Sequence, residues 1–425
     1  MPDDRRARQR TGAGVGLLLT LTLAAVLLTA LPRDHHGEGG GTCTARTVRE
    51  WSPDAKLTDS FAAYGDDETR TDDWTGGDGT HSVRLPDGRV LWLFSDTYLG
   101  RVYAPPNPVG ESYAWRDTAA PLVRNSAVVM RDGHPQLTLP APLFPDPAPN
   151  AWRWPVAARV EPRSPGSAES VVRVLLWTRT AGPYPWIYGV PAATEVATLS
   201  LPDLRVESIV RVFGQELVQD PSQRVQFGTS SVVVGDWTYV FGGNDAQAAA
   251  RPTSSAYVAR VPVGRLGEPD AWQFWDGSAW SARAGPRPVL GDGQHTGVGS
   301  AFSVVRDGGT YVLFTMAAGS RGLTTVTSYW ACSPVGPWHG PTRSFSPPLP
   351  PGQVAAYNPQ AHPELGDGDR LVLSYDVNWL DATATSAALN LSRNVSLYRP
   401  RFVTLRLGPP PRRPRGADRG SGAWR

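Results

Sequence analysis

The sequence is poor in lysine, cysteine and methionine. Lysine occurs once, at Lys56, so nearly all of the 41 basic residues are arginine, set against 39 acidic residues in 425. A formal net charge of +2 is too small for the strongly basic surface that nucleic-acid binding requires, and we expect no nucleic-acid partner. Two cysteines without CxxC or Cys/His spacing argue against structural zinc, and we predict no metal site.

Several catalytic motifs are also missing. The chain has no G-x-S-x-G nucleophile elbow, no H-E-x-x-H zinc motif and no S-x-D-x-G-x-x-W Asp-box of sialidase propellers. No glycine-rich loop follows a strand and opens a helix, so nucleotide binding has no support. These absences exclude the commonest hydrolase and nucleotide-dependent classes, and we expect no cofactor.

The N-terminus predicts export. Residues 1–11 are polar and rich in arginine, and residues 12–31 form a stretch of 20 residues without a charge. Such a stretch can cross a bilayer as a helix, and the arginines place its N-terminal side in the cytoplasm. Because Leu28-Thr29-Ala30 is a poor cleavage site, an uncleaved signal-anchor is favoured over a cleaved signal peptide. We therefore expect an extracytoplasmic protein that is anchored in the membrane or secreted.

Two flanking segments have the composition of unstructured chain. Residues 32–60 are predicted to be a flexible linker and lead-in, and the Pro/Arg-rich residues 408–425 a disordered tail.

Cys43 and Cys332 lie far apart in the sequence. In an exported protein they form either a disulfide or two free thiols, and the sequence leaves both possibilities open.

Residues 61–407 repeat a structural theme. Short Val/Leu/Tyr/Phe-rich strands alternate with Gly/Asp turns. The hairpins lie at 80–94, 229–241, 300–314 and 363–375, with a further strand at 169–177 whose partner is near 154–160. Candidate third strands follow at 126–130, 194–199, 255–261, 325–331 and 401–405. Five such units predict an all-β, five-bladed β-propeller and a monomer; a two-sheet sandwich is the alternative, for which the span is large.

The first hairpin brings two carboxylates together. If Pro86-Asp87-Gly88 is the turn, Leu85 pairs with Arg89, and the same register places Asp78 opposite Asp96. Directly opposed like charges destabilise a strand pair, which suggests a use for them, although each aspartate alone could be a turn residue. Glycoside hydrolysis uses two facing carboxyl groups.

The two aspartates have different surroundings. An apolar strand leads to Asp96, so we assign it the raised pKa and the role of general acid. Asp78 lies among glycines, so we expect it to stay ionised as the base.

Other polar residues occupy equivalent places in the repeats and are candidates for binding sugar hydroxyls. They are His81, His295, Asn244, Asp245, Tyr357, Asn358, His362 and Asp376. For each one alone, a role in a loop or in the core is the alternative. Aromatic residues could stack on sugar rings, although most of the 16 tryptophans are expected to pack between blades.

The stretch T-G-G-D-G-T-H-S-V-R-L-P-D-G-R-V-L-W-L-F-S-D-T-Y-L-G, residues 75–100, carries a family resemblance. With R-D-G-G-T-Y-V-L-F, Y-N-P-Q-A-H-P-E-L and Y-R-P-R-F further on, it resembles secreted actinobacterial five-bladed propellers long described as a domain of unknown function. Some relatives are endo-D-arabinanases. The resemblance implies that Asp78 and Asp96 are the catalytic pair.

We therefore predict an extracytoplasmic glycoside hydrolase on furanosidic, arabinan-like cell-wall polysaccharide. Its expected partners are that polysaccharide and, through residues 12–31, the membrane. The alternative is a non-catalytic, surface-anchored propeller that binds glycan or protein.

Overall fold

The computed structural model describes residues 43–67, 69, 73–249, 251–316, 324–352, 354–379 and 385–410. The predicted signal-anchor 12–31, the basic segment before it and most of the predicted tail lie outside the described residues. Among the residues that are described, no helix is long and apolar enough to cross a membrane.

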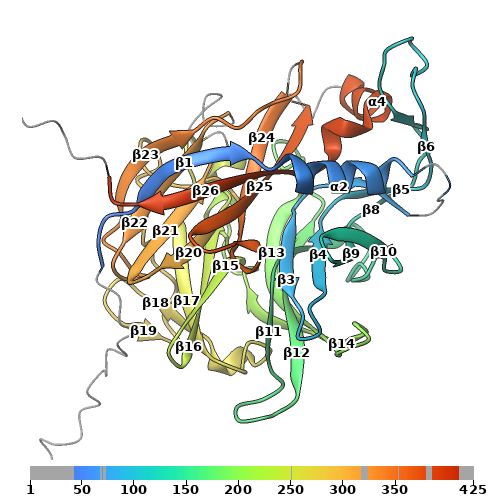
Figure 1. The fold of residues 1–425 in the computed structure, drawn as a ribbon. Coiled ribbons are helices and arrows are strands. Elements are labelled where there is room, and N and C mark those ends of the chain that lie inside the picture. Colours follow the sequence, from blue (N-terminus) through green and yellow to red (C-terminus); the bar gives the residue numbers. More distant parts are fainter. Residues whose placement is uncertain are drawn as a thin grey trace, which may run out of the picture. The chain divides into compact units, whose positions relative to one another are not determined.

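Five antiparallel sheets form the blades of a propeller, as the sequence predicted (Figure 1). Blade 1 contains β3 (His81–Arg84), β4 (Val90–Phe94), β9 (Ser126–Arg131) and β10 (His134–Thr138). Blade 2 contains β11 (Ala151–Pro162), β12 (Ser170–Thr180), β13 (Val190–Leu199) and β14 (Val206–Gly214). Blade 3 contains β15 (Val225–Val234), β16 (Trp237–Asn244), β17 (Ala256–Pro262), β18 (Gln273–Trp275) and β19 (Trp280–Ser281). Blade 4 contains β20 (Phe302–Asp307), β21 (Thr310–Thr315), β22 (Val326–Ala331) and β23 (His339–Phe345).

Blade 5 joins the two ends of the chain. Its strands are β24 (Val354–His362), β25 (Arg370–Trp379), β26 (Arg401–Gly408) and, from the N-terminus, β1 (Thr47–Pro53). The innermost strands β3, β11, β15, β20 and β24 contact one another in that order, and β24 contacts β3. The contacts therefore close into a ring, which excludes an open sandwich.

The remaining elements connect the blades. Strands β2 (Trp74–Gly77), β5 (Thr97–Leu99) and β8 (Leu122–Val123) form a small sheet, and β6 (Val102–Tyr103) pairs with β7 (Trp115–Arg116). The helices are α2 (Ala55–Gly65) and α4 (Thr385–Arg393), with single turns η1 (Pro221–Gln223), η2 (Ala246–Ala249), η3 (Pro269–Ala271), η4 (Pro363–Leu365) and η5 (Val395–Tyr398).

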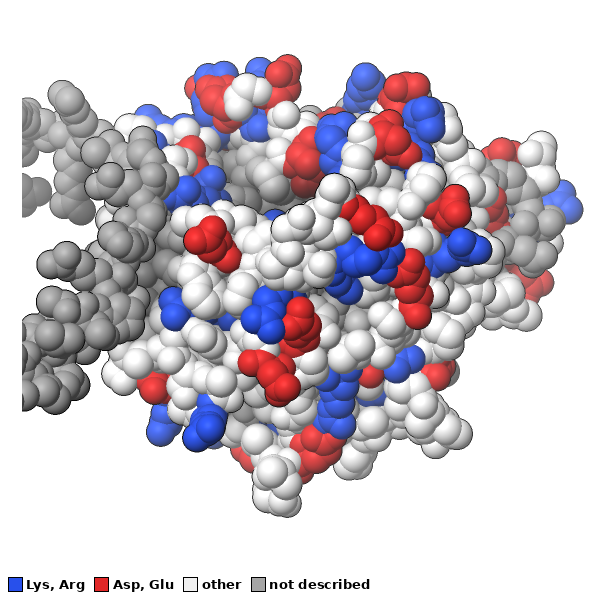
Figure 2. All heavy atoms as spheres, turned by 90° about the horizontal axis from the view of Figure 1, so that it is seen from below, with Lys and Arg blue, Asp and Glu red and all other residues white. Residues whose placement is uncertain are grey.

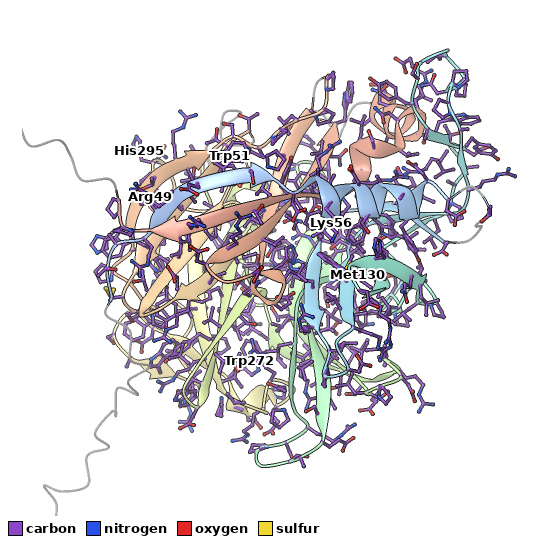
Figure 3. The ribbon with its side chains drawn as sticks, viewed as in Figure 1. Arg49, Trp51, Lys56, Met130, Trp272 and His295 are labelled. Atoms are coloured by element: carbon purple, nitrogen blue, oxygen red, sulfur yellow. A yellow bond between two sulfur atoms is a disulfide. The ribbon has the colours of Figure 1, made fainter. Side chains whose placement is uncertain are left out.

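Residues 32–60 were predicted to be a linker and entry segment, and the described part of this segment contains a strand that was not predicted. Strand β1 pairs with β26 from Thr47 opposite Gly408 to Pro53 opposite Val403. Because it is an edge strand with mostly exposed side chains, it lacks the apolar alternation by which strands are recognised. Its Trp51 stacks on Phe345 of blade 4 with ring centroids 4.8 Å apart (Figure 3).

Helix α2 was also missed. It begins at Asp54, whose side chain accepts a hydrogen bond from the Leu57 N–H at 3.0 Å and so caps the first turn. Phe61 is fully buried and packs edge-on against Trp74 and Trp92. The helix thus fills the seam between blade 5 and blade 1. Its few apolar residues were too short a pattern to predict a helix from the sequence.

All five residues of β4 are buried because both of its faces meet another layer. Leu91 and Leu93 pack in the cluster shared with blade 2, whereas Trp92 and Phe94 pack with Phe402 of blade 5. Alternate side chains of a strand point to opposite faces, so each blade contributes to two cores. This explains the continuous apolar run in place of an apolar/polar alternation.

Charge is mixed on the face from which the β11–β12 turn projects. Figure 2 shows acidic and basic side chains interspersed there, with no large patch of one sign. A groove for a polyanion would gather arginines on one surface, so this face does not favour nucleic-acid binding.

The open question of the cysteines is resolved in favour of a disulfide. Cys43 is bonded to Cys332, across 289 residues of sequence. Cys332 directly follows β22 of blade 4, and Cys43 precedes β1 of blade 5. The bond therefore fixes the strand that closes the ring.

We predict that the double variant Cys43→Ser/Cys332→Ser is less stable than the parent by about 2–5 kcal/mol. Without the disulfide, the unfolded chain between the two positions is no longer a closed loop, so its conformational entropy is higher and unfolding is more favourable. Urea unfolding without reductant measures the difference. Reductant should destabilise the parent and leave the double variant unchanged. Equal unfolding midpoints for the two proteins would contradict the role of the bond.

Candidate active site

One end of the ring collects most of the predicted site residues. Every innermost strand starts at this end and every second strand finishes there, because neighbouring strands are antiparallel. Asp78 precedes β3 and Asp96 follows β4, while Asp245 follows β16. Tyr357 and Asp376, from β24 and β25, pair with each other in blade 5. We call this end the mouth.

The register that was predicted for Asp78 and Asp96 is present in the structure. His81 pairs with Leu93 on one side of the aspartates and Gly77 with Thr97 on the other, so the offset is unchanged across them. The Asp78 N–H donates to the Asp96 carbonyl oxygen at 3.2 Å. The Ser95 N–H donates to the Asp78 carbonyl oxygen at 2.7 Å, so Asp78 faces Ser95 and Asp96 together at the mouth.

The surroundings of Asp78 favour its protonated form. Burial raises its pKa well above the usual value, and the negative charges of Asp96 and Asp376 raise it further. The hydroxyl of Tyr357 donates to Oδ2 of Asp78 at 2.8 Å, and Tyr398 is a second hydroxyl partner. These hydrogen bonds lower the pKa but do not outweigh burial and repulsion. Asp78 is thus able to keep a proton at a pH where an ordinary aspartate is ionised.

Asp96 has a cation beside it. The Nη1 atom of Arg124 lies 3.1 Å from Oδ2 and 3.3 Å from Oδ1, and the indole Nε1–H of Trp154 donates to Oδ1 at 2.8 Å. Burial raises the pKa of Asp96 above its usual value, and Arg124 and Trp154 oppose this rise without cancelling it. Its side chain keeps 21% of its surface exposed.

These surroundings favour the reverse of the roles predicted from the sequence. Asp78 has neutral hydroxyl partners and two like charges nearby, whereas Asp96 has an arginine. An ionised partner stabilises a carboxylate, and like charges favour the acid form. The surroundings therefore favour the protonated form more strongly at Asp78 than at Asp96. The sequence prediction differed because the apolar strand before Asp96 carries no information about Arg124.

Asp376 lies beneath the mouth and anchors the Asp78 turn. Its Oδ2 accepts from the Gly79 N–H at 2.8 Å and from Asn358 Nδ2 at 3.2 Å, and its Oδ1 accepts from Thr80 Oγ1 at 2.7 Å. Burial raises its pKa to about 6. Because the side chain is buried and both oxygens are occupied, the structure does not support the predicted contact of Asp376 with substrate.

Tyr357 and Asn358 both lie partly exposed at the mouth. The β24–β25 register shifts between Tyr357 and Gln360, and Asn358 adopts a left-handed φ of 52°. This bulge turns the two side chains toward Asp78 and Asp376, respectively.

Asp245 belongs to a second polar cluster at the mouth. It forms a buried ion pair with Arg179 and accepts from Ser300 Oγ at 2.7 Å. The Arg179 guanidinium also donates to Gln226 Oε1 at 2.9 Å and lies 5.5 Å from the centre of the Trp154 ring. Through Trp154 this cluster is connected to Asp96.

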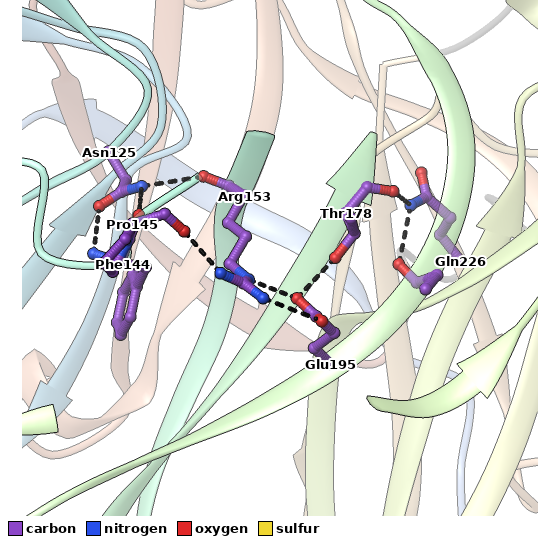
Figure 4. A network of polar contacts seen from close by, with 8 residues as sticks. Asn125, Phe144, Pro145, Arg153, Thr178, Glu195 and Gln226 are labelled. Atoms are coloured by element: carbon purple, nitrogen blue, oxygen red, sulfur yellow. Dashed lines mark hydrogen bonds and ion pairs between the residues drawn. The ribbon is translucent and has the colours of Figure 1, made fainter. Parts of the chain in front are cut away.

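A buried polar frame supports that cluster (Figure 4). Arg153, next to Trp154, forms an ion pair with Glu195, which also accepts from Thr178 at 2.7 Å. Gln226 donates to the Thr178 carbonyl oxygen at 3.1 Å. The frame runs from blade 2 into blade 3 and fixes the strand ends that carry Trp154 and Arg179.

Four predicted binding residues are not part of the site. Burial lowers the pKa values of His81 and His362 to about 3, so both are neutral core histidines. His362 hydrogen-bonds Ser82 at 2.6 Å and Ser374 at 2.8 Å, between blades 1 and 5. Asn244 is buried and accepts from the Ser255 N–H at 2.8 Å. His295 is exposed on a loop at the edge of the molecule in Figure 3, and its backbone N–H donates to Asp292 Oδ1 at 2.7 Å.

The sequence reasoning missed Arg124 and Tyr398. Arg124 could have been found, because β4 and β9 pair Phe94 with Ser126 and the same register places Arg124 opposite Asp96. Tyr398 could not have been found in this way, since it lies in the single turn η5, which belongs to the long connection between β25 and β26. In the part of the chain that the structure describes, no three His, Cys, Asp or Glu side chains converge as a metal site would need.

Comparison with known proteins gives a family and a fold. Residues 61–407 match a family described as a domain of unknown function, DUF5005. A solved structure of a “putative hydrolase” from Bacteroides ovatus has a TM-score of 0.61 and 17% identity, over 84% of this chain and 90% of that chain. At this identity the likeness shows the fold alone. No curated protein matches in sequence.

Two weaker likenesses are to characterised glycosidases. A GH62 α-L-arabinofuranosidase from Coprinopsis cinerea has a TM-score of 0.48 and 12% identity, over 80% of this chain and 92% of that chain. An exo-β-1,3-galactanase from Clostridium thermocellum has a TM-score of 0.43 and 10% identity, over 78% and 59%. Both scores are too low to carry an argument.

We predict that Asp376 makes the folded state less stable as the pH rises from about 4 to about 7. The unfolded side chain ionises near pH 3.9, whereas the folded one keeps its proton until about pH 6, so the folded state binds more protons in between. The stability of the parent relative to Asp376→Asn should fall by roughly 1–3 kcal/mol over this range.

Urea unfolding of both proteins at several pH values measures this difference. The exposed Asp203 offers a matched control, and Asp203→Asn should follow the parent. A difference between parent and Asp376→Asn that is constant with pH would contradict the raised pKa.

Proposed function

We propose that this chain, which belongs to the DUF5005 family, is a glycoside hydrolase that cuts a furanosidic cell-wall polysaccharide outside the cytoplasm. The observation that carries the proposal is the facing pair Asp78 and Asp96, one with hydroxyl partners and the other with an arginine. A pair of carboxyl groups whose surroundings push their pKa values apart is what separates a general acid from a base or nucleophile.

In this mechanism Asp78 gives its proton to the glycosidic oxygen as the bond to the leaving sugar breaks. Tyr357 and Tyr398 orient the carboxyl group. Ionised Asp96 either removes a proton from the attacking water or attacks the anomeric carbon itself, and the separation of the two carboxyl groups decides which. Arg124 and Trp154 stabilise the ionised form of Asp96 against the effect of burial and fix its orientation.

The substrate class rests on the resemblance of residues 75–100 to endo-D-arabinanase propellers. An arabinan-like polymer of the cell wall is therefore the first substrate to test. The disulfide between Cys43 and Cys332 supports a location outside the cytoplasm, because such bonds persist in oxidising compartments. The uncharged residues 12–31 would supply the membrane anchor or export signal.

A non-catalytic propeller that binds glycan is the second candidate, and one observation favours it. Asp96 is already paired with Arg124, and Asp78 is bonded to two tyrosines. In a binding protein the arginine would only neutralise Asp96, and the two hydroxyl groups would only satisfy the hydrogen bonds of Asp78. The two functions differ in one product, since hydrolysis creates new reducing ends and binding does not.

We predict that Asp78→Asn and Asp96→Asn each reduce the release of reducing ends from cell-wall arabinogalactan by about 10²-fold or more, because a proton-transfer group is lost. Product analysis after incubation measures the rate. Asp203→Asn serves as the control and should keep parent activity. Full activity in both active-site variants would rule out the mechanism.

The pH dependence of kcat/KM should identify which aspartate is the acid. In Tyr357→Phe the hydrogen bond that lowers the Asp78 pKa is removed, so the alkaline limb should move to higher pH. In Arg124→Met the cation that lowers the Asp96 pKa is removed, so the acidic limb should move to higher pH. If Tyr357→Phe moved the acidic limb instead, the roles of the two aspartates would be exchanged.

A further inference from the structure

We propose that the loop between β12 and β13, residues 181–189, is a binding surface on which a neutral sugar ring of the substrate stacks next to the cleavage site. The inference rests on the proposed glycosidic substrate and adds to it a binding subsite. The residue that would carry it is Tyr188, with Tyr184 and Ile187 beside it.

The loop exposes three large, mainly apolar side chains. Tyr184 is 85% exposed, Tyr188 51% and Ile187 46%, whereas Trp186 of the same loop is buried. The sequence of the loop, A-G-P-Y-P-W-I-Y-G, contains no charged residue. A contiguous exposed apolar surface marks a binding site, and the absence of charge favours a neutral ligand.

The base of the loop is fixed to the active site. Nη2 of Arg179 donates to the Gly189 carbonyl oxygen at 2.7 Å, and the same guanidinium lies over Trp154, the hydrogen-bond donor to Asp96. Gly189 has a φ of 80°, and a Cβ there would lie 2.5 Å from the ring of Trp152. Only glycine allows this close packing.

Tyr188 is the residue directly before this fixed point. Its hydroxyl is near enough to Tyr357 to be one of the groups that raise the Tyr357 pKa, and Tyr357 is bonded to Asp78. The loop that carries Tyr188 is thus connected to Asp96 through Gly189, Arg179 and Trp154, and Tyr188 acts electrostatically on Tyr357, the hydroxyl partner of Asp78. A sugar bound between Asp78 and Asp96 would have its neighbour within reach of this ring.

An aromatic ring with a polar tip suits a sugar. The ring offers a flat apolar face with little conformational entropy to lose, and the phenol hydroxyl can hydrogen-bond a sugar hydroxyl. Exposed Leu217, 94% exposed and on a separate segment, offers neither a flat face nor a hydroxyl. It is therefore the matched control for a loss of exposed apolar surface.

The test measures binding without turnover. In the full chain with Asp78→Asn, titration with cell-wall arabinogalactan should give saturable binding that Tyr188→Ala weakens by about three- to ten-fold. Tyr188→Phe should retain most of the affinity, and Leu217→Ala should match the parent. Equal affinity for Tyr188→Ala and the parent, or no saturable binding by the parent, would overturn the proposal.

A second measurement separates a sugar site from a membrane-contacting loop. Vesicles of phosphatidylcholine should bind the Tyr188→Ala variant and the parent alike. A loss of vesicle binding in this variant with unchanged arabinogalactan binding would assign the loop to a lipid surface and overturn the proposal. If the Asp78→Asn chain binds arabinogalactan through Tyr188 but the chain with Asp78 intact releases no reducing ends, the subsite stands while the hydrolytic function fails.

Discussion

Electrostatic repulsion between Asp78 and Asp96 is the constraint on which the site depends. One hairpin register places the two carboxylates opposite each other, where like charges are unfavourable. The fold gives the two side chains different partners, which are hydroxyl groups for Asp78 and a guanidinium for Asp96. The repulsion is thereby converted into a difference in proton affinity, which acid–base chemistry requires.

The ring must close for this site to exist. Asp78 comes from the start of blade 1, whereas Tyr357, Asp376 and Tyr398 come from blade 5, about 280 to 320 residues later. The N-terminal strand β1 completes blade 5, helix α2 fills the seam beside it, and the disulfide at Cys43 fixes that strand. The elements that close the propeller are therefore the ones that bring the second half of the site to Asp78 (Figure 1).

The parts of this protein that follow from local sequence were predictable. Blade strands show as short apolar runs, and the turn at Pro86-Asp87-Gly88 fixes the register that carries the aspartate pair. Strand β1 was not predictable, because its edge position leaves no apolar alternation. The surroundings that favour the opposite assignment of acid and base were not predictable for a similar reason. They depend on Arg124 and Tyr398, which reach the aspartates through the fold rather than through sequence neighbourhood.

Neutron crystallography of the protein at about pH 5, where an ordinary aspartate is ionised, tests the central claim most directly. It locates the deuterium atoms on both carboxyl groups in one experiment. The account predicts a deuterium on Asp78 and none on Asp96 beside Arg124. A deuterium on Asp96 with Asp78 ionised, or two ionised carboxylates, would contradict it.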